Sequence, residues 1–144
     1  MDRNIIRISG LVFVLTLLLQ TAQSQVTGMW KTISDADGKE NSIVEVYEHN
    51  GKLYGKIVRL IPDAGAAVCE KCPGDLKNTP ITGLVFLKDL TKTASGGEGG
   101  SIMDPASGKT YKCYIEQAGD DQLKVRVYAG MPSLGKTQMW HRMK

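Results

Sequence analysis

From Gly28 onward, short runs rich in Val, Ile, Tyr and Thr are separated by turns about ten residues apart. No part of this region shows the 3.6-residue periodicity of an amphipathic helix, whereas several runs alternate apolar and polar residues. Regular short strands with turn signals between them are typical of an all-β sandwich or barrel. We expect eight strands, at residues 28–33, 42–48, 52–61, 81–88, 101–104, 109–117, 122–128 and 136–142.

The turns between these runs favour antiparallel neighbours. Asn50-Gly51 is the clearest hairpin signal, because both residues tolerate the positive φ of a type I′ turn. Only the connection from Pro62 to Pro80 is long, and the polar stretch from Thr91 to Gly100 is expected to be a flexible loop. Eight antiparallel strands in sequence close most simply into an up-and-down barrel, since closure removes both exposed edges. The interior of such a barrel is either filled by side chains or able to hold one small ligand.

The first 24 residues have the three parts of a secretory signal. Arg3 and Arg7 give a positive start, the run from Leu11 to Leu19 is apolar except for Thr16, and Ala22-Gln23-Ser24 offers a cleavage site. The apolar run is too short for a membrane-spanning helix, which favours cleavage over an uncleaved tether. We therefore expect residues 1–24 to be removed and residues 25–144 to form one exported domain in the periplasm or cell envelope, without a stable membrane span.

The charge of the mature chain is balanced. Residues 25–144 contain 16 Lys and Arg against 14 Asp and Glu, and the two signs are interspersed. A nucleic-acid-binding domain would show a basic patch or stripe, which this sequence lacks. We expect no nucleic-acid partner, and the sequence identifies no protein partner.

The segment GMPSLGKT, from Gly130 to Thr137, matches the phosphate-binding pattern G-x-x-x-x-G-K-[ST]. A phosphate-binding loop needs a helix directly after it, because the helix N-terminus holds the phosphates. Only seven residues follow Thr137, and their spacing is that of a strand. The segment therefore predicts a hairpin loop that leads into the last strand, and no nucleotide cofactor.

The pair Cys69-Glu70-Lys71-Cys72 permits three interpretations. A redox pair would require a strand–helix setting that is missing, and a zinc site would require Cys113 and His49 or His141 to approach. A disulfide that ties down the long loop suits an exported protein best, so we expect no metal. Cys113 alternates with apolar neighbours, which favours a Cys69–Cys72 bond and a buried Cys113 over a bond between Cys113 and one loop cysteine.

Several strands mix aromatic and polar residues on one face. If these faces point inward, Tyr54, Lys56, Arg126, Gln138 and Trp140 would line a pocket for a small polar or anionic ligand. If they point outward, Leu123, Val125 and Val127 fill the core instead. No catalytic group is expected: the candidate acids for a hydrolase, Asp104 and Glu116, lie on separate strands without an evident partner.

A set of motifs resembles one known family along nearly the whole mature chain. They are Gly28-x-Trp30, GKLYGKIV, Cys69-x-x-Cys72-x-Gly74, Pro80-Ile81-x-Gly83-Leu84, Gly100-x-Ile102-x-Asp104-Pro105-x-x-Gly108-Lys109-x-Tyr111, VRVYAG and LGKTQMWHR. In this order they resemble the bacterial domain-of-unknown-function family 2147. The resemblance implies a small exported lipocalin-like β-barrel and implies no activity.

Gly28-x-Trp30 also resembles the first-strand signature of lipocalins. The resemblance implies that Trp30 lies at the base of the barrel and stacks under a basic residue of the last strand, here Arg142. Two functions follow as expectations. The first is a non-enzymatic protein that binds a small molecule in the barrel mouth. The alternative is an envelope interaction or structural protein with a filled barrel, acting through the loop from Pro62 to Pro80.

Overall fold

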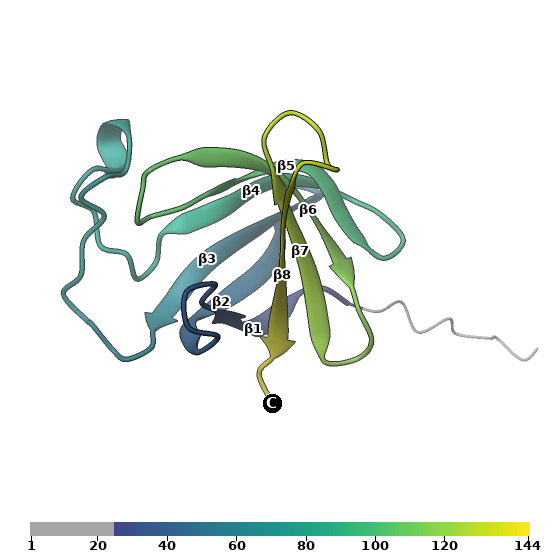
Figure 1. The fold of residues 1–144 in the computed structure, drawn as a ribbon, viewed down its shortest axis with the longest axis horizontal. Helices are drawn as coiled ribbons and strands as arrows, with labels where there is room; N and C mark the ends of the chain where they lie inside the picture. The colour runs from purple at the N-terminus through teal and green to yellow at the C-terminus, as the bar shows by residue number, and fades with distance from the viewer. Residues whose placement is uncertain (1–24) are drawn as a thin grey trace, which may run out of the picture.

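The computed structural model describes residues 25–144, and the signal predicted for residues 1–24 lies outside them. In this described part, eight strands form a closed barrel in the order of the sequence (Figure 1). The strands are β1 (Gly28–Ile33), β2 (Glu40–His49), β3 (Lys52–Leu60), β4 (Val85–Lys92), β5 (Gly96–Met103), β6 (Thr110–Gln117), β7 (Gln122–Tyr128) and β8 (Gly135–Arg142). One 3₁₀ turn, η1 (Gly74–Leu76), lies in the long β3–β4 loop.

Every strand pairs antiparallel with the next, and β8 pairs with β1 to close the barrel. The predicted all-β up-and-down barrel is therefore confirmed. The β2–β3 turn has the expected positive φ values, 50° at Asn50 and 79° at Gly51. The segment from Gly130 to Thr137 is a hairpin loop followed by the start of β8, as the strand-like spacing of the residues after Thr137 predicts.

The glycine-rich stretch corrects one expectation. Residues 91–100 are not a flexible loop, because Thr91 and Lys92 end β4 and Gly96 begins β5. A Cβ atom on Gly96 would lie 2.0 Å from the carbonyl oxygen of Ile115, and one on Gly100 would lie 2.4 Å from that of Lys88. The neighbouring strands thus pack against bare backbone, which explains why a strand is built from residues that usually weaken one.

Inward-facing side chains fill the half of the barrel nearest to Trp30, which is its closed end. Leu53, Ile115, Leu123 and Val125 are at most 2% exposed. At the closed end the Trp30 ring is fully buried, and its indole N–H donates to the Val26 carbonyl at 2.9 Å. The Arg142 guanidinium lies 4.2 Å from the Trp30 ring centroid.

The Arg142 side chain also closes the barrel end through the main chain. It donates hydrogen bonds to the carbonyls of Gln25 at 2.6 Å, Thr27 at 3.3 Å and Asp120 at 3.1 Å. One side chain thus joins the segment before β1, the β6–β7 turn and the last strand, with its cation over the Trp30 ring.

Cys113 is a free thiol within this core, on β6 and fully buried. Burial raises the pKa of the Cys113 thiol from 9.0 to about 12, because the thiolate would lose its hydration. Since the thiolate is the nucleophile, the buried thiol should be inert.

Native protein without reductant should therefore resist iodoacetamide at pH 8, where the higher pKa lowers the thiolate fraction about a thousandfold. In guanidinium chloride the same protein should gain one carbamidomethyl group per chain, counted by intact mass. Fast labelling of the native protein would contradict the burial. A label on Cys69 or Cys72, located by peptide mass, would show that Cys113 is paired with the other loop cysteine.

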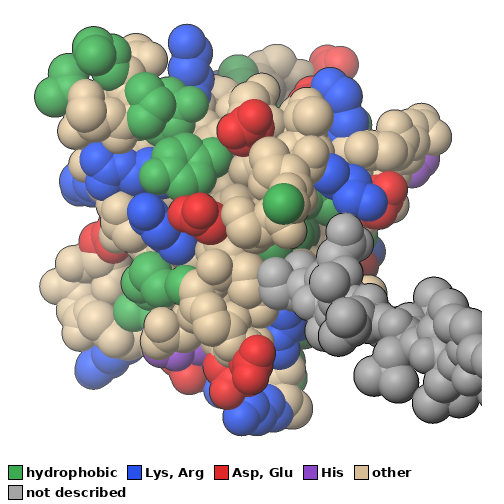
Figure 2. Space-filling model, turned by 90° about the vertical axis from the view of Figure 1, so that its right-hand side faces the viewer, with side chains coloured by type: hydrophobic (Ala, Val, Ile, Leu, Met, Phe, Trp, Pro, Cys, Tyr) green, Lys and Arg blue, Asp and Glu red, His purple; other side chains and the backbone are tan. Residues whose placement is uncertain are grey.

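The outer faces of the strands carry charges of both signs, and Figure 2 shows them interspersed over one side of the molecule. Ion pairs join the strands. Lys56 of β3 pairs with Glu45 of the neighbouring β2 at 3.6 Å, and Lys92 of β4 reaches Glu48 of β2 across β3 at 3.0 Å. Such exposed pairs add little stability. No helix within residues 25–144 has the length and apolar character needed to cross a membrane.

Candidate functional site

A cavity of about 980 Å³ opens at the end of the barrel opposite Trp30. Its lining includes residues from the β1–β2, β3–β4, β5–β6 and β7–β8 connections, which together form the mouth. Drug-sized molecules usually bind in clefts of roughly 300–1,000 Å³. The half of the barrel towards the mouth is therefore hollow, and the volume of this cavity suits a small molecule.

The inner wall of the cavity is apolar. Ile57, Phe86, Ile102 and Trp140 line it from β3, β4, β5 and β8. The Phe86 and Trp140 rings lie 6.0 Å apart between centroids and are tilted by 43°. Both rings are largely buried by their neighbours, with Trp140 1% exposed, so they form a rigid wall rather than mobile side chains.

A chain of side-chain hydrogen bonds leads from this wall to the mouth. The Trp140 indole N–H donates to Gln138 Oε1 at 3.2 Å, and Gln138 Nε2 donates to Asp35 Oδ2 at 3.4 Å. The bond from Trp140 fixes which end of the Gln138 amide faces Asp35. All three residues line the cavity, and Asp35 lies in the β1–β2 turn.

A second polar group lies where β1 meets β2. Thr32 shares hydrogen bonds with Asn41 and with the Ser42 hydroxyl, and all three line the cavity. Thr32 and Ser42 are buried polar residues, 8% and 9% exposed. A cavity with an apolar wall and a few fixed polar groups is typical of a small-molecule site.

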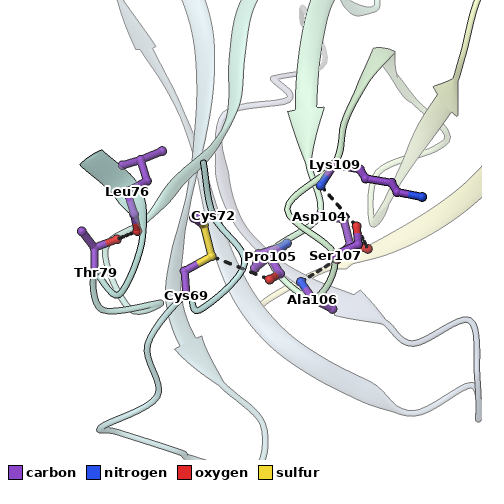
Figure 3. The surroundings of a disulfide bond; sticks show 9 residues. All are labelled: Cys69, Cys72, Leu76, Thr79, Asp104, Pro105, Ala106, Ser107 and Lys109. Carbon is purple, nitrogen blue, oxygen red and sulfur yellow. Dashed lines mark hydrogen bonds between the residues drawn. A yellow bond between two sulfur atoms is a disulfide. The ribbon is translucent and has the colours of Figure 1, made fainter. Parts of the chain in front are cut away.

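The disulfide loop forms another part of the wall (Figure 3). Cys69 and Cys72 are bonded, and the Cys69 amide and carbonyl pair with Thr79 and Asn78 at 2.8 Å each. The loop is thereby folded back on itself. Its residues Val68, Glu70 and Lys71 line the cavity, as does Ile81 directly after it. The loop from Pro62 to Pro80 is thus part of the cavity wall.

The β5–β6 turn packs directly against this loop. Asp104 begins the turn by accepting hydrogen bonds from the Ala106 amide at 2.9 Å and the Ser107 hydroxyl at 3.0 Å (Figure 3). A Cβ atom on Gly108 would lie 1.8 Å from the carbonyl oxygen of Lys71. Only glycine allows the two segments to approach so closely.

The structure separates the five ligand contacts expected from the sequence. Gln138 and Trp140 line the cavity together. Tyr54, Lys56 and Arg126 do not line it, and the inward placement considered for them is corrected: Leu53, Gly55 and Ile57 occupy the inward positions of β3, as Leu123 and Val125 do on β7.

These three outward side chains have partners on the barrel surface. The Tyr54 hydroxyl donates to Asp89 Oδ1 at 2.8 Å, and this bond to a carboxylate raises the pKa of Tyr54. Lys56 pairs with Glu45 across β2 and β3. Arg126 donates to the Pro132 carbonyl and to the Thr137 hydroxyl, both at 2.9 Å.

The polar groups at the β1–β2 end of the cavity were not identified from the sequence. Thr32 could have been found, because it is the next inward position after Trp30. Ser42 could have been found as well, because it continues the inward alternation of Val44 and Val46 on β2. Asn41 could not, because the β1–β2 register shifts between Thr32 and Ile33 and leaves Asn41 without a partner on β1.

The structure also places the residues considered for metal binding and catalysis. Within residues 25–144, no group of three or more His, Cys, Asp or Glu side chains could hold a metal ion. Asp104 belongs to a turn, whereas Glu116 lies on β6 with Lys124 at 3.9 Å. The two acids expected for a hydrolase are not brought together.

The seam between β1 and β8 is short. Two residue pairs join these strands, Trp30 with Arg142 and Lys31 with His141, whereas each other pair of strands in the described barrel shares at least four. Towards the mouth, the Gln138–Asp35 hydrogen bond spans the seam. Ile33 and Gly135, on either side of it, line the cavity.

The barrel resembles a solved structure, that of protein HP1028 from Helicobacter pylori, which is described as belonging to the lipocalin family. The two are 30% identical with a TM-score of 0.76, and the similarity covers 83% of this chain and 84% of that one. No curated protein matches the chain. Residues 28–142 match the family described as uncharacterized proteins conserved in bacteria, DUF2147, and the chain therefore belongs to this family.

Proposed function

We propose that the protein is an exported, non-enzymatic carrier that binds an amphipathic small molecule in the barrel cavity. The observation that supports this most strongly is the open cavity of about 980 Å³, which a barrel serving only as a scaffold would not need. The family assigns no activity, and the lipocalin-like fold is one whose interior can hold a single ligand.

The arrangement of the lining suggests how the ligand is oriented. Its apolar part would lie against Ile57, Phe86 and Ile102, where burial of apolar surface provides most of the affinity. Its polar part would lie near Gln138 and Asn41, towards the mouth. Both signs of charge occur at the rim, as in Asp35 and Lys136, so an uncharged polar group fits as well as the anionic one expected from the sequence.

Native intact mass, measured on protein purified from its periplasm without reductant, tests the proposal. We expect the mass of residues 25–144 less two hydrogens, plus an organic species that is lost on denaturation. A bare native mass, together with no thermal stabilisation by single-chain amphiphiles, would count against a carrier and favour an interaction role. An increment of one zinc ion with reduced thiols would contradict the disulfide.

Replacing Gln138 with Ala should weaken binding of the co-purifying ligand about fivefold, the effect of losing one hydrogen-bonding partner. Lys56→Ala removes a side chain of the outer surface and is the matched control, expected to leave the dissociation constant unchanged. Isothermal titration of both variants checks this, at a temperature where both are folded. Equal weakening by Lys56→Ala would place the ligand on the outer face instead.

A further inference from the structure

The β7–β8 loop, residues 129–134, presents apolar side chains to solvent beside the cavity mouth. Within residues 25–144 the exposed large hydrophobic residues are Val68, Met131, Leu134 and Met143. Met131 and Leu134 are the most exposed, at 61% and 69%. In Figure 2, hydrophobic side chains gather at the upper left, where this loop lies, with basic side chains next to them.

The loop is held with these side chains outward. Arg126 donates from Nε to the Pro132 carbonyl at 2.9 Å, and the Leu134 amide donates to the Met131 carbonyl at 3.0 Å. Arg126 is itself fixed by its bond to the Thr137 hydroxyl. Exposure of Met131 and Leu134 is therefore imposed by a supported turn, although a soluble protein gains nothing from exposing such a pair.

The apolar surface continues from the loop into the cavity. Leu134 is exposed and also lines the cavity, and so does Val68 on the opposite loop of the mouth. A ligand with an apolar part could pass from outside to the inner wall without leaving apolar contacts. This continuity would serve a molecule taken up from, or delivered to, an apolar phase.

The strand residues that flank this loop include two basic side chains. Arg126 and Lys136 lie next to the loop on β7 and β8, whereas Lys124, Arg142 and Lys144 lie towards the closed end, where Lys124 and Lys144 pair with Glu116 and Asp121. The acidic side chains of the mouth, Asp35, Glu70 and Asp104, belong to the other three connections. Apolar tips flanked by basic side chains are typical of segments that dock on anionic lipid surfaces.

We propose that the β7–β8 hairpin docks the cavity mouth on an anionic lipid bilayer, with Met131 and Leu134 inserted among the lipids and Arg126 and Lys136 near the headgroups. The inference goes beyond the carrier function, since it uses outer side chains and does not require an occupied cavity. If it holds, the ligand of the carrier is a molecule that partitions into membranes.

Flotation with vesicles of one part phosphatidylglycerol to three parts phosphatidylethanolamine tests the docking. We expect the mature protein to float with these vesicles and not with phosphatidylcholine vesicles. The double variant Met131→Ser with Leu134→Ser should bind at least about tenfold more weakly, because two apolar side chains no longer leave water. Lys136→Gln should weaken binding about fivefold at low salt.

Met143→Ser is the matched control, because it also removes an exposed methionine, 39% exposed, but at the closed end after β8. It should leave vesicle binding unchanged. A fluorescence readout gives depth: Met131→Trp should be quenched by lipids with brominated acyl chains. Absence of flotation, as expected if the loop binds a protein instead, would overturn the proposal. Unchanged flotation of the double variant, or equal flotation with phosphatidylcholine, would also overturn it.

The two proposals fail separately. Protein that floats with anionic vesicles but has a bare native mass and no response to amphiphiles would retain the docking surface and refute the carrier. Protein that co-purifies with an organic ligand but ignores vesicles would retain the carrier and refute the docking.

Discussion

Replacing Trp30 with Ala is expected to lower the free energy of unfolding by about 4 kcal/mol, the usual cost of truncating a fully buried aromatic residue. The change removes a fully buried ring, its hydrogen bond to the Val26 carbonyl and the surface on which the Arg142 guanidinium rests. For a domain of this size the midpoint of thermal unfolding should fall by about 15 °C. Urea unfolding followed by circular dichroism measures the change.

Two further variants give this prediction its controls. Trp30→Phe keeps an apolar ring and loses the indole N–H, so it should cost about 1–2 kcal/mol and remain measurable if the alanine variant does not fold. Met29→Ala changes the neighbouring, half-buried residue of the same strand and should cost at most about 1 kcal/mol. A loss below about 1 kcal/mol for Trp30→Ala would mean that the closed end contributes little to stability.

Gly108→Ala should destabilise the barrel by about 3–4 kcal/mol, for two separate reasons. The residue has a φ of 72°, a left-handed conformation that costs an alanine about 1–2 kcal/mol. Its new Cβ atom would also lie 1.8 Å from the Lys71 carbonyl oxygen, so the disulfide loop and the β5–β6 turn would have to move apart. Urea unfolding of the oxidised protein measures the loss.

Gly119→Ala separates the two reasons. Gly119 has a similar φ of 80°, but a Cβ atom there would meet nothing within 4 Å. This variant should lose only the conformational part, about 1–2 kcal/mol. Equal losses for the two variants would show that close packing of Gly108 against the disulfide loop contributes nothing to stability.

The barrel could be predicted because its signals are local. Turn residues such as Asn50-Gly51 and the alternation of Leu123, Val125 and Val127 fix strands and connections without knowledge of distant contacts. The β5 strand could not be predicted in the same way. Its glycines are required by the main chain of β4 and β6 on either side, at Lys88 and Ile115, and no local pattern reports such long-range packing.

The candidate site was only partly predictable for a related reason. Gln138 and Trp140 are two residues apart on β8, so the sequence predicts that they lie on the same face of the strand, and both line the cavity. On β3 the inward face contains Gly55, which gives no apolar signal, so Tyr54 and Lys56 seemed equally able to face the interior. The role of the long loop as a cavity wall depends on its contact with Gly108, a residue of a different hairpin.

The short seam between β1 and β8 also determines how large a ligand the barrel can accommodate. Seven of the eight strand pairings in the described barrel are longer ladders, and widening the barrel there would break several main-chain hydrogen bonds. At the seam, β1 and β8 can move apart on the mouth side of the Lys31–His141 pair. This movement breaks the single Gln138–Asp35 hydrogen bond and costs about 1 kcal/mol. The circumference of the barrel can therefore change near the mouth, whereas it is fixed around Trp30. The barrel can accept ligands of different width without disturbing the packing of its core.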